Sequence, residues 1–530
     1  MAGKGPGARV HFVELRILDG AESIGGTKVF LDTGNMRLLL DFGLNYKRYG
    51  LYFEEYLKPR SSRGIADLWR LGLIPHHPDL YRDDLWPGDL PREGSPLEVD
   101  LILISHAHMD HCGLLGVVRP DIPVAASPTT WAILKAIQDA GKAEFHAETV
   151  YTVPRERVPG DPRVLKAPLR KSTAARVREI RLVGEAPAEL VEFLQRPPNP
   201  RGRGLESGNI YSLADNSTGW GIRTFGVDHS IPGAVGYAVE TDAGWVAYTG
   251  DLRLHGKGRE QTIRFVEEVK RLRPRVLLIE GTRAGPRGGG NPTEEEVAVR
   301  AHGIVAKNPG KLVIADFSPR QVERLQSFLE IAEATGRILV VLAKDMYLLE
   351  ALEMCGWLEG AVGSPYLAIY DDVRVNPRAW ERDIRERYRA RMVGPQEVRE
   401  GPGRFILAFS FWDLKNLLDI EPQGGVYIYS SSEAHGEEQE IDMRRLWEWL
   451  RYFGLEVHGF AIDATGNPVF SGGLHASGHA CPEDLLFIAR EISPEILIPI
   501  HTEHPEFFAE RLKGEPIEVR QVKDGDVIKI

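Results

Sequence analysis

The sequence predicts an α/β or α+β protein with sandwiched sheets, and two patterns lead to this fold class. Short apolar runs rich in Ile, Leu and Val end repeatedly at polar or glycine-containing junctions, which is typical of buried strands. From Lys311 onward, apolar runs alternate with helical patterns, as they do in a parallel sheet. With 530 residues, of which 43% are hydrophobic, the chain is long enough for roughly two domains.

Five apolar runs of the first and last parts of the chain are expected to be strands whose ends present functional groups. They are MRLLLDFG near Asp41, VDLILISHAH near His106, GWVAYTGD near Asp251, PRVLLIEGT near Glu280 and EILIPIHTE near His501. A run of roughly four to eight apolar residues can also be a buried helix segment, but the richness in Ile, Val and Leu favours a strand.

A second region begins after Glu280. The cluster GPRGGGNP, from Gly285 to Pro292, breaks the chain, and Thr293 with Glu296 forms a capping-box pattern that opens a helix. The expected elements that follow are the strand KLVIADF, a helix at 319–334, the strand GRILVVLA, a helix through 358, a strand from 426 and an amphipathic helix through 450. The sequence therefore predicts a first domain at 1–284 that returns at 461–530, and an inserted domain at 285–460.

Two further insertions interrupt the first domain. The insertion at 44–96 is rich in Tyr, Trp, Arg and Asp, and the insertion at 140–209 contains a basic stretch between Tyr151 and Arg181. That stretch is either a solvated surface or an arm that follows phosphates, and the sequence leaves both readings open. The net charge of −11 argues against sequence-independent attraction to nucleic acid over the whole surface.

Composition also excludes several classes of protein. The N-terminal residues lack the pattern of a signal peptide, and no apolar stretch approaches the roughly 20 residues that span a bilayer, so we expect a cytoplasmic protein without a membrane partner. The three cysteines, Cys112, Cys355 and Cys481, form no CxxC pair, which argues against a disulfide framework and against a thiolate zinc site.

The strongest chemical signal is the segment SHAHMDH, which follows the expected strand VDLILI. It places His106, His108, Asp110 and His111 within six residues. Imidazole and carboxylate ligands suit divalent ions such as Zn²⁺ or Mn²⁺. If the strand continues to His106, alternation puts His106 and His108 on one face, and a turn then delivers the other two ligands nearby.

Two shorter fragments supply what such a site lacks. Asp228 and His229 precede a Gly-rich apolar stretch, and Asp251 follows Thr249 and Gly250 at the end of a strand. A single His is more often a satisfied core residue, and Asp after Thr-Gly is more often a turn former. Both readings lose weight once the fragments are taken together with the histidine segment.

The order and spacing of LLLDFG, ISHAHMDHCGLLG, VDHSIPGAVGYAVE and AYTGDLRLHG resemble the successive motifs of the metallo-β-lactamase superfamily. The large insertion after Glu280 and the later motifs LHASGHA and LIPIHTE resemble the β-CASP nucleases, most closely the ribonuclease J branch. The resemblance implies an αββα sandwich with an inserted β-CASP α/β domain. It covers nearly the whole chain except the insertions at 44–96 and 140–209.

The resemblance also implies a ligand set for two metal ions. One ion would be held by His106, His108 and His229, and a second by Asp110, His111 and His501, with Asp251 bridging both. Asp41 would be the partner that orients a ligand histidine, because metal-bound imidazoles usually donate their other nitrogen to a neighbour. The expected ions are Zn²⁺ or Mn²⁺.

Further residues are implied to act on the substrate. His479 and Glu280 would complete the site, and His475 and Ser477, with His479, would bind a substrate phosphate. Two cations can lower the pKa of a shared water and stabilise both oxygens of an in-line displacement at phosphorus, and His479 could protonate the leaving 3′ oxygen. Asp251, His479 and Glu280 are therefore the expected catalytic residues.

The sequence thus favours a metal-dependent nuclease of single-stranded RNA, with DNA left open as a substrate and the 5′–3′ exonuclease mode favoured over the endonuclease mode. One alternative is a metallo-hydrolase of a small phosphodiester, thioester or lactone, since the first motifs are shared across those activities. Another is a non-catalytic scaffold of an RNA-processing complex. Assembly of the chain as a homodimer is also left open. The glycine-rich segment of the ribonuclease J insert is absent, and FILAFSFWDLKN takes its approximate place.

Overall fold

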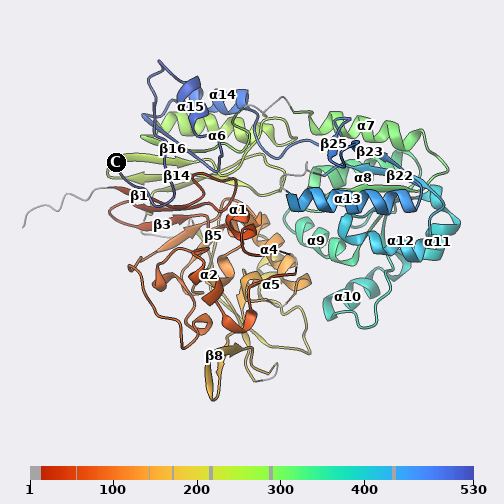
Figure 1. Cartoon of the computed structure of the whole chain (residues 1–530), viewed down its shortest axis with the longest axis horizontal. Coiled ribbons are helices and arrows are strands. Elements are labelled where there is room, and N and C mark those ends of the chain that lie inside the picture. The colour runs from red at the N-terminus through yellow and green to blue at the C-terminus, as the bar shows by residue number, and fades with distance from the viewer. Residues whose placement is uncertain are drawn as a thin grey trace, which may run out of the picture.

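The computed structural model describes residues 13–530 except 55, 143, 170–171, 214–218, 286–290 and 432–436, and it describes no side chains at 437–441. Figure 1 shows two lobes: the N-terminal and C-terminal parts of the chain form one, and the middle part forms the other. The expected break at Gly285–Pro292 falls largely on 286–290 and so lies outside the described residues.

The first lobe is built on two sheets that pack face to face. One sheet has the strand order β12-β10-β5-β4-β3-β2-β1-β28, and the other has the order β13-β14-β15-β16-β26-β27. The strands of the first sheet are β1 Glu14–Asp19, β2 Lys28–Asp32, β3 Arg37–Leu40, β4 Leu101–Leu103, β5 Val124–Ala126, β10 Ile180–Leu182, β12 Ile210–Ser212 and β28 Val527–Lys529. Those of the second sheet are β13 Ile222–Gly226, β14 Val235–Thr241, β15 Gly244–Tyr248, β16 Val276–Glu280, β26 Ile496–Ile500 and β27 Glu518–Val519.

Alternating apolar side chains of both sheets form the core between them, as the strand period of two requires. Leu38 and Leu40 of β3 meet Val276 and Leu278 of β16 in this core. Helices α6 (Arg259–Leu272), α14 (Pro482–Ile492) and α15 (Glu506–Arg511) cover the outer face of the second sheet, and α4 (Pro128–Ala140) and α5 (Ala188–Gln195) pack against the first. The αββα sandwich expected from the sequence is therefore confirmed.

All five strands expected in this lobe are present, as β3, β4, β15, β16 and β26. β4, β16 and β26 are wholly buried, and β3 and β15 are buried over their later residues, which explains why these sequences are mostly apolar instead of alternating. β16 and β26 pair in parallel, from Val276 with Ile496 to Glu280 with Ile500. The chain thus leaves this sheet at the end of β16 to form the second lobe, and it returns to the sheet as β26, beside β16.

The insertions add irregular structure to the outer face of the first sheet. The earlier one contains α1 (Tyr46–Gly50) and α2 (Ala66–Arg70), and the later one contains α5, β6 (Tyr151–Thr152), β7 (Glu156–Val158), β8 (Asp161–Lys166), β9 (Ala175–Val177) and β11 (Leu205–Glu206). The range 140–209 also includes β10, which is a strand of the first sheet itself, so this range is not wholly an insertion. In the basic stretch, Arg178 is buried and donates to the carbonyls of Leu115 and Thr149. Arg155 pairs with Glu148 at 2.7 Å. These two arginines stabilise the fold, so the phosphate-following reading does not hold for them, and Arg170 and Lys171 lie outside the described residues.

The second lobe contains a parallel sheet with the strand order β20-β19-β18-β21-β17-β22-β23, as the alternating pattern predicted. Helices cover both faces, α7 to α9 on one and α12 and α13 on the other. The strands are β17 Val313–Asp316, β18 Ile338–Val341, β19 Leu367–Tyr370, β20 Met392–Val393, β21 Phe405–Ala408, β22 Gly425–Tyr429 and β23 Leu455–His458. The helices are α7 Glu294–Ala306, α8 Val322–Ala334, α9 Ala343–Glu353, α10 Ala379–Arg387, α11 Pro395–Glu400, α12 Leu417–Ile420 and α13 Glu437–Tyr452.

Some helix boundaries differ from those expected. The Thr293–Glu296 capping box is present and opens α7. α8 begins at Val322 instead of Pro319, because 318–321 form a turn after β17. α9 ends at Glu353 instead of Leu358, where tight turns follow up to Gly356. After α13, a short hairpin of β24 (Phe460–Ile462) and β25 (Pro468–Phe470) leads the chain back to the first lobe.

The two lobes are joined by direct packing of α4 against α9. The Tyr347 hydroxyl of α9 donates to Asp139 Oδ2 of α4 at 2.8 Å, and the Trp357 indole N–H donates to Thr129 Oγ1 at 3.0 Å. Asp139 is fully buried and also pairs with the buried Lys135. None of the helices in the described part of the chain is both long and apolar enough to cross a bilayer.

Candidate metal centre

The histidine segment lies where β4 leaves the first sheet. β4 ends at Leu103, so the strand does not continue to His106, and the expectation that strand alternation aligns His106 with His108 is wrong. His108 is instead the N-cap residue of the short helix α3 (Met109–Cys112), which carries Asp110 and His111. The loop still brings His106 Nε2 within 3.0 Å of His108 Nδ1.

Glycines allow the neighbouring chain to pass close to α3. A Cβ atom at Gly43 would lie 1.6 Å from the Asp110 carbonyl oxygen, and one at Gly25 would lie 2.8 Å from Asp110 Cβ. Neither contact is tolerable for a larger residue, so the sequence must be glycine at both positions. The close approach holds Asp110 from both sides.

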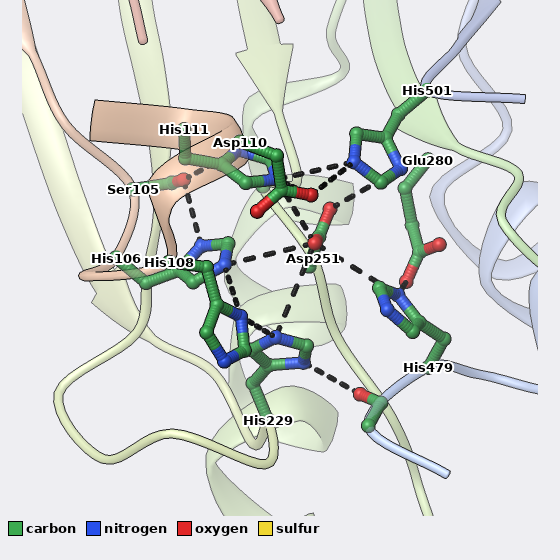
Figure 2. Close-up of polar contacts among 12 residues, drawn as sticks. Ser105, His106, His108, Asp110, His111, His229, Asp251, Glu280, His479 and His501 are labelled. Carbon is green, nitrogen blue, oxygen red and sulfur yellow. Dashed lines mark hydrogen bonds and ion pairs between the residues drawn. The ribbon is translucent and has the colours of Figure 1, made fainter. Parts of the chain in front are cut away.

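Two ligand sets meet around Asp251, as Figure 2 shows. His229 Nε2 lies 3.0 Å from His108 Nδ1, which completes a group with His106. His501 Nε2 lies 3.2 Å from both His111 Nε2 and Asp110 Oδ2. Asp251 Oδ2 lies 3.0 Å from His111 Nε2 and 3.6 Å from His106 Nε2, so it reaches both groups.

The donor sets suit divalent cations. Both carboxylate oxygens of Asp251 are buried, and no hydrogen bond of good geometry reaches them from the described residues. A buried, uncompensated carboxylate is costly unless a cation is at hand. The set of imidazoles and carboxylates is the one that Zn²⁺ and Mn²⁺ prefer. These groups are therefore compatible with metal binding.

The pKa shifts of the histidines differ in direction between the two groups. Burial lowers the pKa of His106 and His229, and lowers that of His108 to about 4, which keeps these imidazoles neutral as ligands must be. Burial acts in the same direction on His111, but Asp251, Asp110 and Asp41 raise its pKa well above the ordinary value. The second group thus carries the negative charges of Asp110 and Asp251, whose pKa values are lowered, against the effect of burial, by the neighbouring histidines, and a cation bound there would meet these charges.

Most ligand histidines have a partner on the nitrogen that faces away from the site. His111 Nδ1 lies 2.7 Å from Asp41 Oδ2, and His106 Nδ1 lies 3.0 Å from Ser105 Oγ. His229 Nδ1 lies 2.5 Å from the Gly478 carbonyl oxygen, and His501 Nδ1 lies 2.9 Å from Thr282 Oγ1. Such partners fix ring orientation in metal sites. Asp41 and His501 both have positive φ, 58° and 52°, directly after a strand, and such backbone strain is typical of functional sites.

His479 lies beside the centre, on the loop that leads from β25 to α14. Its Nδ1 lies 3.2 Å from Glu280 Oε1 and 3.8 Å from Asp251 Oδ2. Burial opposes protonation, but Glu280 and Asp251 raise the pKa of His479 to about 9. Glu280 is itself fixed by the backbone N–H groups of Leu252 and Thr282.

The loop that carries His479 also holds the two residues expected to bind a phosphate. His475 Nδ1 is buried without a hydrogen-bond partner among the described residues, and burial and nearby Arg324 lower the pKa of His475 to about 3. Ser477 Oγ accepts from the His479 N–H at 3.1 Å. The two side chains thus lie on the loop next to the centre, with an internal bond already made by Ser477.

Comparisons with known proteins agree with this geometry. Residues 473–521, which span His475 to His501, match the family described as Zn-dependent metallo-hydrolase RNA specificity domain. The chain is similar to ribonuclease J of Mycolicibacterium smegmatis, with 23% identity over 81% of this chain and 63% of the relative. It is also similar to ribonuclease J of Pyrococcus abyssi, with 22% identity over 93% of this chain and 90% of the relative.

These matches support the resemblance of the chain to the β-CASP nucleases of the metallo-β-lactamase superfamily, and among these to the ribonuclease J branch, as its motifs indicated. The chain spans less than two thirds of the length of the mycobacterial relative. A crystal structure of a protein of unknown function from Enterococcus faecalis has the same fold, with a TM-score of 0.66, 22% identity and coverage of 98% of this chain and 100% of that one.

Three residues around this centre were not identified from the sequence. Ser105 donates to Asp41 Oδ2 at 2.7 Å, and the Tyr248 hydroxyl donates to the same oxygen. Arg253 is buried and donates to Asp228 Oδ1 at 3.2 Å and to Glu294 Oε1 at 3.1 Å, which joins the two lobes. Ser105 is the first residue of SHAHMDH, Tyr248 directly precedes the TGD motif, and Arg253 follows Asp251 by two residues. Their nearness to these motifs is the sequence feature that could have indicated them.

Proposed function

We propose that this chain is a metal-dependent nuclease that hydrolyses phosphodiester bonds in single-stranded RNA. The observation that carries the proposal is the buried Asp251 carboxylate between two ligand groups, with a protonated His479 beside it. The match to an RNA specificity domain and the similarity to two proteins named ribonuclease J support RNA as the substrate.

The proposed ligand sets are His106, His108 and His229 for one ion, and Asp110, His111 and His501 for another, with Asp251 shared. Divalent cations bound there, Zn²⁺ in the first place and Mn²⁺ as the alternative, would lower the pKa of a water and neutralise charge at phosphorus. Elemental analysis of the protein purified without chelator should find close to two ions per chain, and replacing Asp110 and His111 together should remove at least one.

His479 is the proposed proton donor to the leaving 3′ oxygen. With its pKa raised to about 9, it holds a proton at neutral pH, and Glu280 keeps the ring in place at 3.2 Å. Asp41, through His111, and Gly478, through His229, orient the ligand rings. Each of these roles is assigned to a side chain whose geometry is fixed by a described contact.

The exonuclease mode rests on His475 and Ser477. A terminal 5′ phosphate held by these residues would set the scissile bond one nucleotide downstream, so the products should be mononucleotides. The buried and unpartnered His475 Nδ1 supports this assignment, because a phosphate oxygen could accept from it. Phosphate binding would also offset the low pKa of His475.

An end-labelled digestion series tests the function. Single-stranded RNA, single-stranded DNA and duplex substrates with 5′-phosphate, 5′-hydroxyl or blocked ends should give mononucleotides chiefly from 5′-phosphorylated RNA. Replacing His475 and Ser477 by Ala should depress this stepwise release more than internal cleavage and should leave the metal content unchanged. Internal cuts alone would establish an endonuclease, and no cleavage of any nucleic acid with added Zn²⁺ or Mn²⁺ would refute the proposed function.

A further inference from the structure

The early insertion begins at the metal centre. The backbone N–H of Phe42 donates to the His111 carbonyl at 2.8 Å, and that of Leu44 donates to the Met109 carbonyl at 2.9 Å. The chain therefore runs directly alongside α3 before it forms α1. Tyr46, the first residue of α1, thus lies two residues beyond the contact of Leu44 with α3.

α1 is fixed between two ligand-bearing loops. Asn45 caps the helix and donates to the buried Asp19, and Arg48 donates to the Gly72 carbonyl at 2.5 Å. Lys47 Nζ lies 2.7 Å from Glu503 Oε1, two residues beyond the ligand His501. Figure 1 shows α1 on the side of the first lobe that faces the second. These contacts fix Asn45, Lys47 and Arg48 in place, and none of these contacts involves the side chain of Tyr46.

The segment that follows exposes an unusual number of large apolar side chains. We define the tyrosine surface as the five side chains of Tyr46, Leu51, Tyr52, Tyr56 and Leu57. Their exposed fractions are 53%, 73%, 45%, 81% and 59%, respectively. Tyr49 and Phe53, whose rings lie 5.1 Å apart, anchor the same segment inward. Exposed apolar patches of this kind on a folded protein mark interaction sites. The exposed side chains of the tyrosine surface therefore indicate a site for a binding partner.

The chemistry of this surface fits nucleotide bases. Aromatic rings beside basic side chains are the usual platform for single-stranded nucleic acid, because every base can stack on a ring whatever its identity. Lys47 and Lys58 lie within the segment.

We propose that the tyrosine surface is a stacking platform for the bases of a single-stranded RNA whose scissile phosphate lies at the metal centre, with Tyr46 in contact with the nucleotide nearest the cut. The proposal rests on the proposed function for the nature of its ligand. It gives the insertion at 44–96 a role in substrate binding. We propose single-stranded RNA as the ligand of this surface because the segment that carries it is continuous with the centre through the contacts of Phe42 and Leu44 with α3.

The test separates stacking from backbone binding. In an Asp251→Asn background, which prevents cleavage, fluorescence anisotropy measures the affinity for single-stranded oligoadenylate and for an abasic strand with the same backbone. Tyr46→Leu should weaken oligoadenylate binding about 5- to 100-fold, and Tyr52→Leu and Tyr56→Leu should act in the same direction. Binding of the abasic strand should change by less than about twofold, since no base is present to stack.

Two matched variants make the result specific. Tyr46→Phe keeps the ring and should bind oligoadenylate within about twofold of the parent. Tyr452→Leu removes a tyrosine that is 79% exposed at the end of α13 and should leave oligoadenylate binding unchanged. If Phe at position 46 behaves like Leu, or if both strands lose affinity equally, stacking is refuted.

The remaining outcomes distinguish this inference from the proposed function. If the wild-type chain cleaves RNA while all three leucine variants bind oligoadenylate normally, only the platform is wrong. If the wild-type chain neither binds nor cleaves RNA, the proposed function fails first. If sedimentation shows that the variants change a dimer into a monomer without changing RNA affinity, the surface joins two copies of the chain and the inference is overturned.

Discussion

Asp41 is the residue that holds His111 of the second group in place. Its carboxylate is fully buried and accepts from the Ser105 N–H and hydroxyl and from Tyr248, and it lies 2.7 Å from His111 Nδ1. A carboxylate with this many donors is fixed in place, so it can hold the imidazole in one orientation. The motif LLLDFG indicated Asp41, but its donors come from distant parts of the chain.

Replacing Tyr248 by Phe should weaken metal binding without unfolding the protein. The ring remains buried, but Asp41 loses one donor, and loss of such an outer partner typically lowers metal affinity about 10- to 100-fold. Tyr237→Phe is the control, since its equally buried hydroxyl donates to the Ile104 carbonyl at 2.7 Å. Competition against a chelator gives both affinities. Equal losses in the two variants would mean that Tyr248 only stabilises the fold.

At the scale of elements, strands were easier to predict than helix ends. The strands β3, β4, β15, β16 and β26 are apolar over most of their length, so each run could be located from composition alone. The start of α8 and the end of α9 depend on turns that follow a strand and a helix, where the pattern of apolar residues continues without marking the change. His106 and His108 lie close together as predicted, but strand alternation is not the cause. β4 stops at Leu103, and the loop after it brings the two side chains together. The limits of the inserted domain stay a prediction.

The end of β17 makes the second lobe sensitive to pH. Asp316 is buried, and burial raises its pKa to about 7, against the hydrogen bond from the Tyr427 hydroxyl. Between the unfolded pKa near 3.9 and this value, the folded state keeps a proton that the unfolded state has released. Stability is therefore greatest below about pH 4 as far as this group is concerned, and the contribution is lost as pH rises to about 7.

Asp316→Asn should remove that dependence. At pH 8 the variant should be more stable to urea than the wild type, by about 2 to 4 kcal/mol at most, and near pH 4 the two should unfold at similar concentrations. Asp383→Asn, an exposed change on α10, should shift stability by less than about 0.5 kcal/mol at either pH. A wild-type stability that does not fall between pH 5 and pH 7 relative to the variant would contradict the argument.

At the scale of the whole molecule, the packing of α4 on α9 holds the two lobes together. Asp139 accepts from Tyr151 at 2.9 Å and from Tyr347 at 2.8 Å, and it pairs with Lys135, so a buried charged group of the first lobe is satisfied partly by the second. A second buried network joins Arg253 with Glu294, and Glu294 with Arg324. No local pattern in the sequence marks such networks, because their members lie on separate elements.

Tyr347→Phe should destabilise this junction. The buried Asp139 would lose one donor, which costs about 1 to 3 kcal/mol for a bond to a charged group. Tyr370→Phe is the matched control in the same lobe, because the buried Tyr370 hydroxyl has no hydrogen-bond partner among the described residues and its removal should be neutral or slightly stabilising. Chemical denaturation compares the two variants. Equal stabilities would show that Asp139 is satisfied without Tyr347.

The metal centre is assembled from parts of the chain that are made far apart in time. His111 and His501 face each other at 3.2 Å across 390 residues of sequence, and β26, which delivers His501, inserts beside β16 only after the second lobe has been made. During synthesis, the second lobe and all strands of the first sheet except β28 can form while His501 is still missing. The complete set of candidate ligands thus forms only near the end of translation. A chain that stalls before β26 would lack His501, so an unfinished copy of this protein would carry an incomplete second group.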